Sequence, residues 1–72
     1  MEELLNRIRG ALYLANAGGW KPTVIRLNQS FDALVAHLKA TDQPLQVEGV
    51  PIGQSMRAGV VDDAGRFVNF DE

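Results

Sequence analysis

Several residue types that stabilise small domains or build reactive sites are scarce in this chain. Its 72 residues include no cysteine and only one histidine. The lack of cysteine excludes disulfides and thiolate metal sites, and one histidine cannot form an imidazole-rich metal centre. A domain of this length buries only about 60 % of its unfolded surface. We therefore expect one domain over residues 1–72, no metal or other cofactor, and added stability from self-association or from a protein partner.

Clusters of positive charge are also missing. The seven Lys and Arg residues are spread along the chain, and the net charge is −2. A nucleic-acid surface needs grouped cations to displace counterions from phosphates, so we expect no nucleic-acid partner. No apolar run approaches the length of a membrane span, and the acidic start Met1-Glu2-Glu3 does not fit a secretory signal. We expect no membrane contact and a cytoplasmic location.

Apolar periodicity predicts an α+β domain. Residues 2–16 carry apolar side chains at helical spacing, and Gly18-Gly19 then favours a helix end. Residues 23–27 alternate as a strand. A second helix follows, with a short polar cap at Asn28 or Ser30. Its predicted sheet-facing stripe is Phe31, Leu34, Val35 and Leu38.

The sequence pattern predicts two further extended segments. Residues 45–52 are expected to form one strand with Leu45 and Val47 inward, and Gly49 and Pro51 suggest a bulge or an edge position. Residues 58–70 have the pattern of a hairpin whose turn uses Gly65. The predicted order is α-β-α-β-β-β, with two helices packed on one face of a small mixed sheet.

Some residues are not explained by this fold. The C-terminal hairpin is apolar on both faces, which calls for one helix layer and a partner. Gly10 interrupts a helix, either to allow close backbone approach or as a tolerated residue. Trp20 is either a lid over one end of the core or a binding anchor. The predicted interaction residues are Tyr13, Trp20, Arg57, Val61 and Phe67.

No set of residues has the spacing of a catalytic or metal site. Ser30 and His37 are two helical turns apart, about 10 Å, which is too far for a hydrogen bond. Asp62-Asp63 lacks the ligand spacing of a calcium loop, and Asp71-Glu72 reads as a frayed acidic tail. We therefore expect a protein that is not an enzyme and has no catalytic residue.

The central stretch resembles a segment of tailed-phage major capsid and structural proteins. The similar residues are Pro-Thr-Val-Ile-Arg-Leu-Asn at 22–28, then a short helix, then Val-Glu-Gly-Val-Pro-Ile at 47–52. The resemblance covers about residues 22–52, and the chain lacks the long N-terminal arm, extended loop and spine helix of a capsid subunit. It implies a small phage or prophage accessory protein, located in the host cytoplasm or in the virion, and it transfers no functional residue.

Three functions remain open from the sequence. The first is a non-enzymatic phage-type structural or accessory protein that self-associates or docks on a larger assembly. The second is a small inhibitor of a host enzyme or defence complex. The third is a small-molecule-binding domain with a pocket at a subunit interface, near Tyr13, Trp20 and Arg57. The inhibitor would use an acidic surface formed by Glu2, Glu3, Asp62, Asp63, Asp71 and Glu72.

Overall fold

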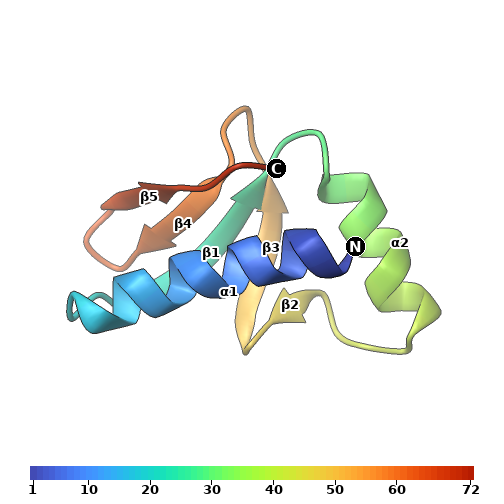
Figure 1. Ribbon diagram of the computed structural model, residues 1–72, viewed down its shortest axis with the longest axis horizontal. Coiled ribbons are helices and arrows are strands. Elements are labelled where there is room, and N and C mark those ends of the chain that lie inside the picture. Colours follow the sequence, from blue (N-terminus) through green and yellow to red (C-terminus); the bar gives the residue numbers. More distant parts are fainter.

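The computed structural model describes residues 1–72 as two helices and one five-stranded mixed sheet (Figure 1). The elements are α1 (Glu2–Ala17), β1 (Pro22–Leu27), α2 (Phe31–Ala40), β2 (Gln46–Val47), β3 (Val50–Gln54), β4 (Gly59–Asp62) and β5 (Phe67–Asn69). This confirms the predicted α+β fold class, with one strand more than predicted. Neither helix is long and apolar enough to cross a membrane.

Helix α1 forms because its apolar residues recur on one side. That side is buried, and it consists of Leu4, Ile8, Ala11, Leu12 and Ala15. The opposite side is polar in its first turns, where Arg7 Nη2 donates to Glu3 Oε1 at 3.0 Å. An exposed pair of this kind stabilises a helix by only about 0.3–0.5 kcal/mol, so packing of the apolar side holds α1 in place.

The sheet has the strand order β2-β3-β1-β4-β5. Strands β1 and β3 are parallel, with Ile25 opposite Ile52, and α2 lies in the connection between them. The other neighbours are antiparallel. The C-terminal hairpin is confirmed, and Gly65 has the positive φ of 82° that its turn requires.

The prediction of one strand over residues 45–52 was wrong. Two strands, β2 and β3, pair as a hairpin, because Glu48 and Gly49 have φ of 51° and 82° and form a tight turn. Positive φ at both central residues is typical of a type I′ turn. Val47 is buried as predicted, whereas Leu45 is 44 % exposed because it precedes the hairpin.

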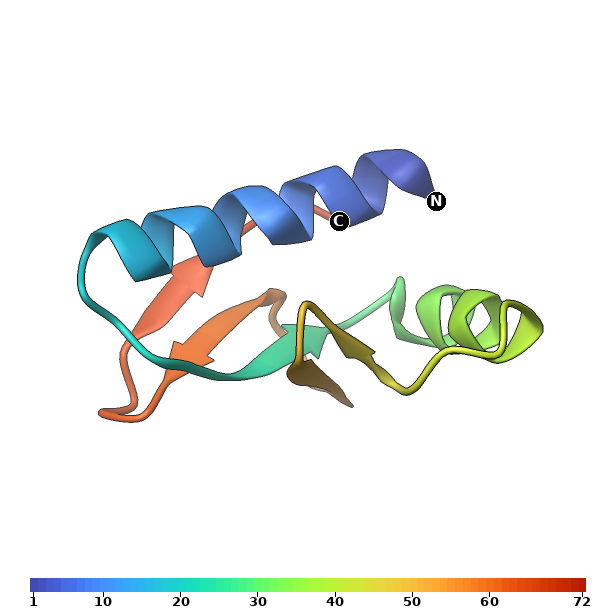
Figure 2. The same ribbon diagram turned by 90° about the horizontal axis from the view of Figure 1, so that it is seen from below.

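One side of the sheet carries the core, and we call it the closed side. Ile25, Leu27 and Val60 point to this side and are fully buried. Helix α1 crosses it (Figure 2). Helix α2 lies beyond the β2–β3 part of the sheet and adds Leu34 and Leu38 to the same core. Both helices therefore serve one hydrophobic cluster.

Candidate interaction face

The other side of the sheet has no helix over it (Figure 2), and we call it the open face. Register assigns its residues: Val24 lies opposite Val61, and Val61 lies opposite Phe67. Each of these residues adjoins a residue of the closed side, so its side chain points the opposite way. The open face consists of Val24, Arg26, Pro51, Gly53, Gly59, Val61, Phe67 and Asn69.

Phe67 forms the centre of an apolar patch on this face. Its ring lies across Gly59 on the neighbouring strand, and this contact leaves no room for a side chain there. A Cβ atom at Gly59 would collide with the ring and would lie 2.6 Å from the carbonyl oxygen of Val68. Gly59 is therefore buried by the ring, while Phe67 itself stays half-buried. Aromatic cover of a strand glycine fixes the ring against the sheet.

Two arginines give the open face its charge. The Arg57 guanidinium lies 5.4 Å from the centroid of the Phe67 ring, and its Nη2 donates to Asn69 Oδ1 at 3.4 Å. A cation over an aromatic ring is worth about 0.5–1 kcal/mol at an exposed site. Arg26 is exposed on β1, between Gly53 and Gly59. The two ion pairs of the molecule are Arg7–Glu3 and Arg66–Asp62, so neither Arg26 nor Arg57 has a carboxylate partner.

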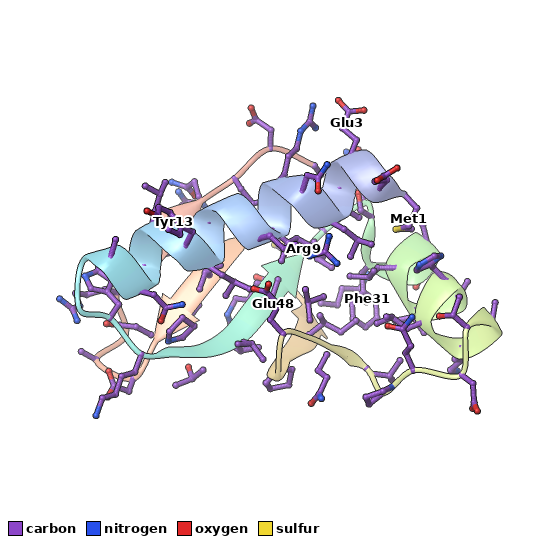
Figure 3. All side chains as sticks on the ribbon, turned by 60° about the horizontal axis from the view of Figure 1, so that its bottom comes forward. Met1, Glu3, Arg9, Tyr13, Phe31 and Glu48 are labelled. Carbon is purple, nitrogen blue, oxygen red and sulfur yellow. The ribbon has the colours of Figure 1, made fainter.

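The structure brings three of the five predicted interaction residues together. Arg57, Val61 and Phe67 share the open face. Tyr13 is 73 % exposed on α1 (Figure 3), which lies on the closed side. Trp20 lies in the connection between α1 and β1. Whether any of the five binds a partner stays a prediction. Val24 was not among the predicted interaction residues, although the alternation of residues 23–27 places it with Arg26 on the strand face opposite Ile25 and Leu27.

Trp20 is held by a stack of side chains at the hairpin turn. The Arg66 guanidinium lies 4.5 Å from the centroid of the indole ring, and Arg66 Nε donates to Asp62 Oδ2 at 2.6 Å. The backbone adds a link, since the Asp63 amide donates to the Lys21 carbonyl at 3.1 Å. These contacts favour the lid interpretation of Trp20, because they tie the α1–β1 connection to the hairpin.

Asp62 is the one charged side chain that is buried. Its Oδ1 accepts from the amides of Arg66 and Ala64, at 2.6 Å and 3.1 Å. Burial acts to raise the pKa of Asp62, but the Arg66 amide, the Arg66 guanidinium and the Ala64 amide outweigh it and lower that pKa below its ordinary value. Its carboxylate is thus fully engaged inside the hairpin.

The predicted frayed tail was wrong at Glu72. Its Oε1 accepts from the amides of Asn28 and Ser30, each at 2.9 Å, at the start of α2. Ser30 takes the predicted N-cap position, but its side chain makes no capping bond, and Glu72, 42 residues away, binds the amide of Ser30 itself. Desolvation acts to raise the pKa of Glu72, yet the Ser30 and Asn28 amides lower it overall.

Two surface clefts are present, and neither matches the predicted pocket near Tyr13, Trp20 and Arg57. The larger, of about 250 Å³, lies between α1 and β5. The smaller, of about 130 Å³, lies where α1, α2 and the β2–β3 turn meet, with Arg9 and Glu48 at its rim (Figure 3). Both are below the range of about 300–1,000 Å³ that is usual for small-molecule sites.

The remaining sequence candidates are spread over the molecule. Ser30 begins α2 and His37 lies in its last turn. No group of three or more His, Asp or Glu residues could hold a metal ion. The acidic set is also divided: Glu3 pairs with Arg7, Asp62 is buried, and Glu72 binds the start of α2. These carboxylates do not form one continuous surface.

Comparison of the chain with protein-family models, curated proteins and solved structures found no match. The resemblance of residues 22–52 to phage structural proteins stays a prediction. In the structure this stretch runs from β1 through α2 and the β2–β3 turn into the first half of β3. It forms the centre and one edge of the sheet, and it supplies Val24, Arg26 and Pro51 to the open face.

Proposed function

We propose that the chain is a non-enzymatic structural or accessory protein that docks on a larger assembly through the open face of its sheet. One observation carries the proposal: Val24, Val61 and Phe67 lie on a sheet face that has no helix layer, while both helices pack into the core on the other side. Domains are built from packed layers, and a sheet face with apolar residues is stabilised by a second layer. A protein partner supplies that layer.

The positive charge of the open face indicates what kind of partner surface would bind to it. Arg26 and Arg57 are the charged side chains at the open face, and neither forms an ion pair, although the chain as a whole has a net charge of −2. A partner surface with an apolar centre and carboxylates around it complements this arrangement. Aromatic and arginine side chains are the residues that most often carry binding energy at protein interfaces. Phe67 with Arg57 stacked on its ring is such an anchor.

The kind of assembly is suggested by the sequence. The resemblance of residues 22–52 to phage structural proteins supports a phage particle, or a precursor of one, as the docking partner. In that setting the protein acts in the host cytoplasm or in the virion. Nothing in the clefts or side-chain clusters favours the inhibitor or the small-molecule-binding function over this one.

Site-specific photo-cross-linking in the native cells tests the proposal. A photoreactive residue replaces Pro51, which is exposed on the open face, or Asn6, which is exposed on α1. We expect a defined protein adduct from position 51 and none from position 6. In the position-51 background, Arg26→Glu should abolish the adduct, whereas Arg9→Glu, an equal charge change on α1, should preserve it. Equal adducts from both positions, or an adduct that survives Arg26→Glu, would contradict docking through the open face.

A further inference from the structure

The open face is arranged in two rows that run across the strands. The first row is apolar, since Val24, Val61 and Phe67 lie side by side on β1, β4 and β5. Pro51 continues this row on β3, beside Val24 in the parallel register of β1 and β3. Neighbouring strands are about 4.8 Å apart, so these four residues form a strip about 14 Å long and one residue wide. We call this strip the apolar row.

The second row is positively charged and has little side-chain cover. Arg26 on β1 lies between Gly53 on β3 and Gly59 on β4, and a glycine has no side chain that could shield or pair with it. Arg57 lies beside this row, because its guanidinium stacks on the Phe67 ring and that ring lies across Gly59. The two arginines therefore flank one glycine, and no carboxylate of this chain pairs with either of them.

The two glycines of this row differ in what they do for the fold. Gly59 is required, since the Phe67 ring and the Val68 carbonyl oxygen occupy the space of a side chain. At Gly53 a Cβ atom would make only an ordinary contact with Val24 Cγ2, at 3.7 Å. Its φ is outside the left-handed region, and the register of β1 and β3 is regular around it. A glycine inside a strand weakens it and often marks a place where another chain approaches closely. Nothing in this chain fills the space at Gly53, which leaves it for a group from outside.

The shape of the apolar row favours a helix as the covering element. Strands β3, β1 and β4 are interior strands of the sheet, so a segment that lies on their face must satisfy its own backbone groups. A second sheet would cover both rows and bury the Arg26 guanidinium, whereas a helix is a cylinder that can cover one row and leave the next at its flank. About ten helical residues span 14 Å. Helix α1 crosses the strands in this way on the closed side (Figure 1).

We propose that an amphipathic helix of the partner protein lies along the apolar row and places an Asp or Glu side chain in the space at Gly53, paired with Arg26. This inference rests on the docking proposal and names the partner's contact element. Helical residues three or four positions apart are about 5–6 Å apart, close to the spacing of strands. A second acidic residue at that spacing would face Arg57, which lies directly before β4, the neighbour of β1.

Charge complementarity favours this occupant over the alternatives. The open face carries two arginines without carboxylates, so an acidic flank fits it. A second copy of this chain does not fit, because its own open face would place arginine opposite arginine and the apolar sides of both its helices are already buried in the core. A nucleic acid would supply negative charge but no apolar cover for Val24 and Val61.

Identification of the cross-linked partner segment tests the proposal. The adduct from position 51 is digested, and the attached peptide is sequenced by mass spectrometry. We expect apolar residues at helical spacing, with Asp or Glu three or four positions apart on one flank. A segment with strand alternation, a segment without this acidic spacing, or a segment of a second copy overturns the helix proposal and leaves docking through the open face intact. A nucleic-acid adduct, or no adduct from position 51, overturns both proposals.

A glycine substitution tests the space beside Arg26 without any change of charge. Gly53→Val fills that space, and valine is favoured in strands, so circular dichroism should show a folded protein. The yield of the position-51 adduct should fall about tenfold or more, because the acidic side chain is displaced. Gly10→Val is the matched control, since a Cβ atom at Gly10 on α1 also meets nothing within 4 Å, and it should keep the wild-type yield. An undiminished adduct from Gly53→Val overturns the proposal, even where Arg26→Glu abolishes the adduct.

A charge exchange tests the ion pair once the partner segment is known. Replacement of the partner's acidic residue by arginine should reduce the adduct of the wild-type chain, because it places two cations together. The same partner variant should restore the adduct of Arg26→Glu. If the exchanged pair yields no more adduct than Arg26→Glu with the unaltered partner, the pairing at Arg26 is wrong.

Discussion

The two faces of the sheet differ in the side chains that adjacent residues place on them. In β4, Val60 points to the closed side and is fully buried, whereas Val61 points to the open face and is half-buried. The closed side pairs Ile25 with Ile52 and with Val60, all aliphatic. The open face instead combines valines with an aromatic ring, two arginines and two glycines. Fold stability is therefore concentrated on one face, and the other is available for binding.

The construction of the open face is tested by a pair of glycine substitutions. Gly59→Ala should destabilise the protein by about 1–3 kcal/mol, because its Cβ meets the Phe67 ring and the Val68 carbonyl oxygen. Gly53→Ala lies on the same face but meets only Val24 Cγ2 at 3.7 Å, an ordinary contact. It should change stability by less than about 1 kcal/mol. Urea unfolding measures both variants, and equal losses would show that Phe67 is not fixed on Gly59.

The closed side also depends on a buried carboxylate. Asp62→Asn should lower the midpoint of thermal unfolding, because the neutral amide loses the charge that Arg66 pairs with. The pKa of Asp62 is lower in the folded protein than in the unfolded chain. Its contribution is therefore complete above the unfolded value of about 3.9 and is lost as the pH falls through the folded value. The wild type should lose stability in acid more steeply than Asp62→Asn; parallel pH profiles would contradict this role.

Substitution of Glu72 should change the stability of the protein less than the substitutions above. Glu72→Gln should destabilise the protein by about 0.5–1 kcal/mol near neutral pH, because the start of α2 loses a charged hydrogen-bond acceptor. The pKa of Glu72 is also lowered on folding, so this difference is complete above the unfolded value of about 4.3 and should disappear as the pH falls through the lower folded value. Asp71→Asn, which removes the same charge from the neighbouring residue, is the control and should leave stability unchanged. Chemical unfolding monitored by circular dichroism measures all three proteins.

Local patterns were sufficient to predict much of this fold. The spacing of the buried residues in α1, the alternation in β1 and the turn at Gly65 are all determined by neighbouring residues. The β2–β3 turn was missed because Glu48 occupies a positive-φ position that asparagine or glycine usually takes. The contact of Glu72 with Asn28 joins residues 44 positions apart and leaves no local pattern.

The candidate interaction face could be predicted only in part, because some of its contacts depend on tertiary structure and leave no local sequence pattern. The alternation of Val60, Val61, Phe67 and Val68 predicted a hairpin with two apolar faces, and the register of the structure places Val61 and Phe67 together on the open face. Sequence could not show that Arg57 stacks on Phe67, since the loop before β4 has no periodicity. Nor could it show that Tyr13 and Trp20 lie away from this patch, because their positions depend on how α1 crosses the sheet.

The most direct test of the two-face account compares Val60→Thr with Val61→Thr. Both substitutions keep shape and strand propensity and add one hydroxyl, so only the face differs. Val60→Thr should reduce the free energy of unfolding by about 1–3 kcal/mol, because its hydroxyl enters the core without a partner. Val61→Thr should change it by less than about 0.5 kcal/mol, because its hydroxyl reaches water. Equal losses at the two positions would contradict the claim that one face holds the fold and the other is free to bind.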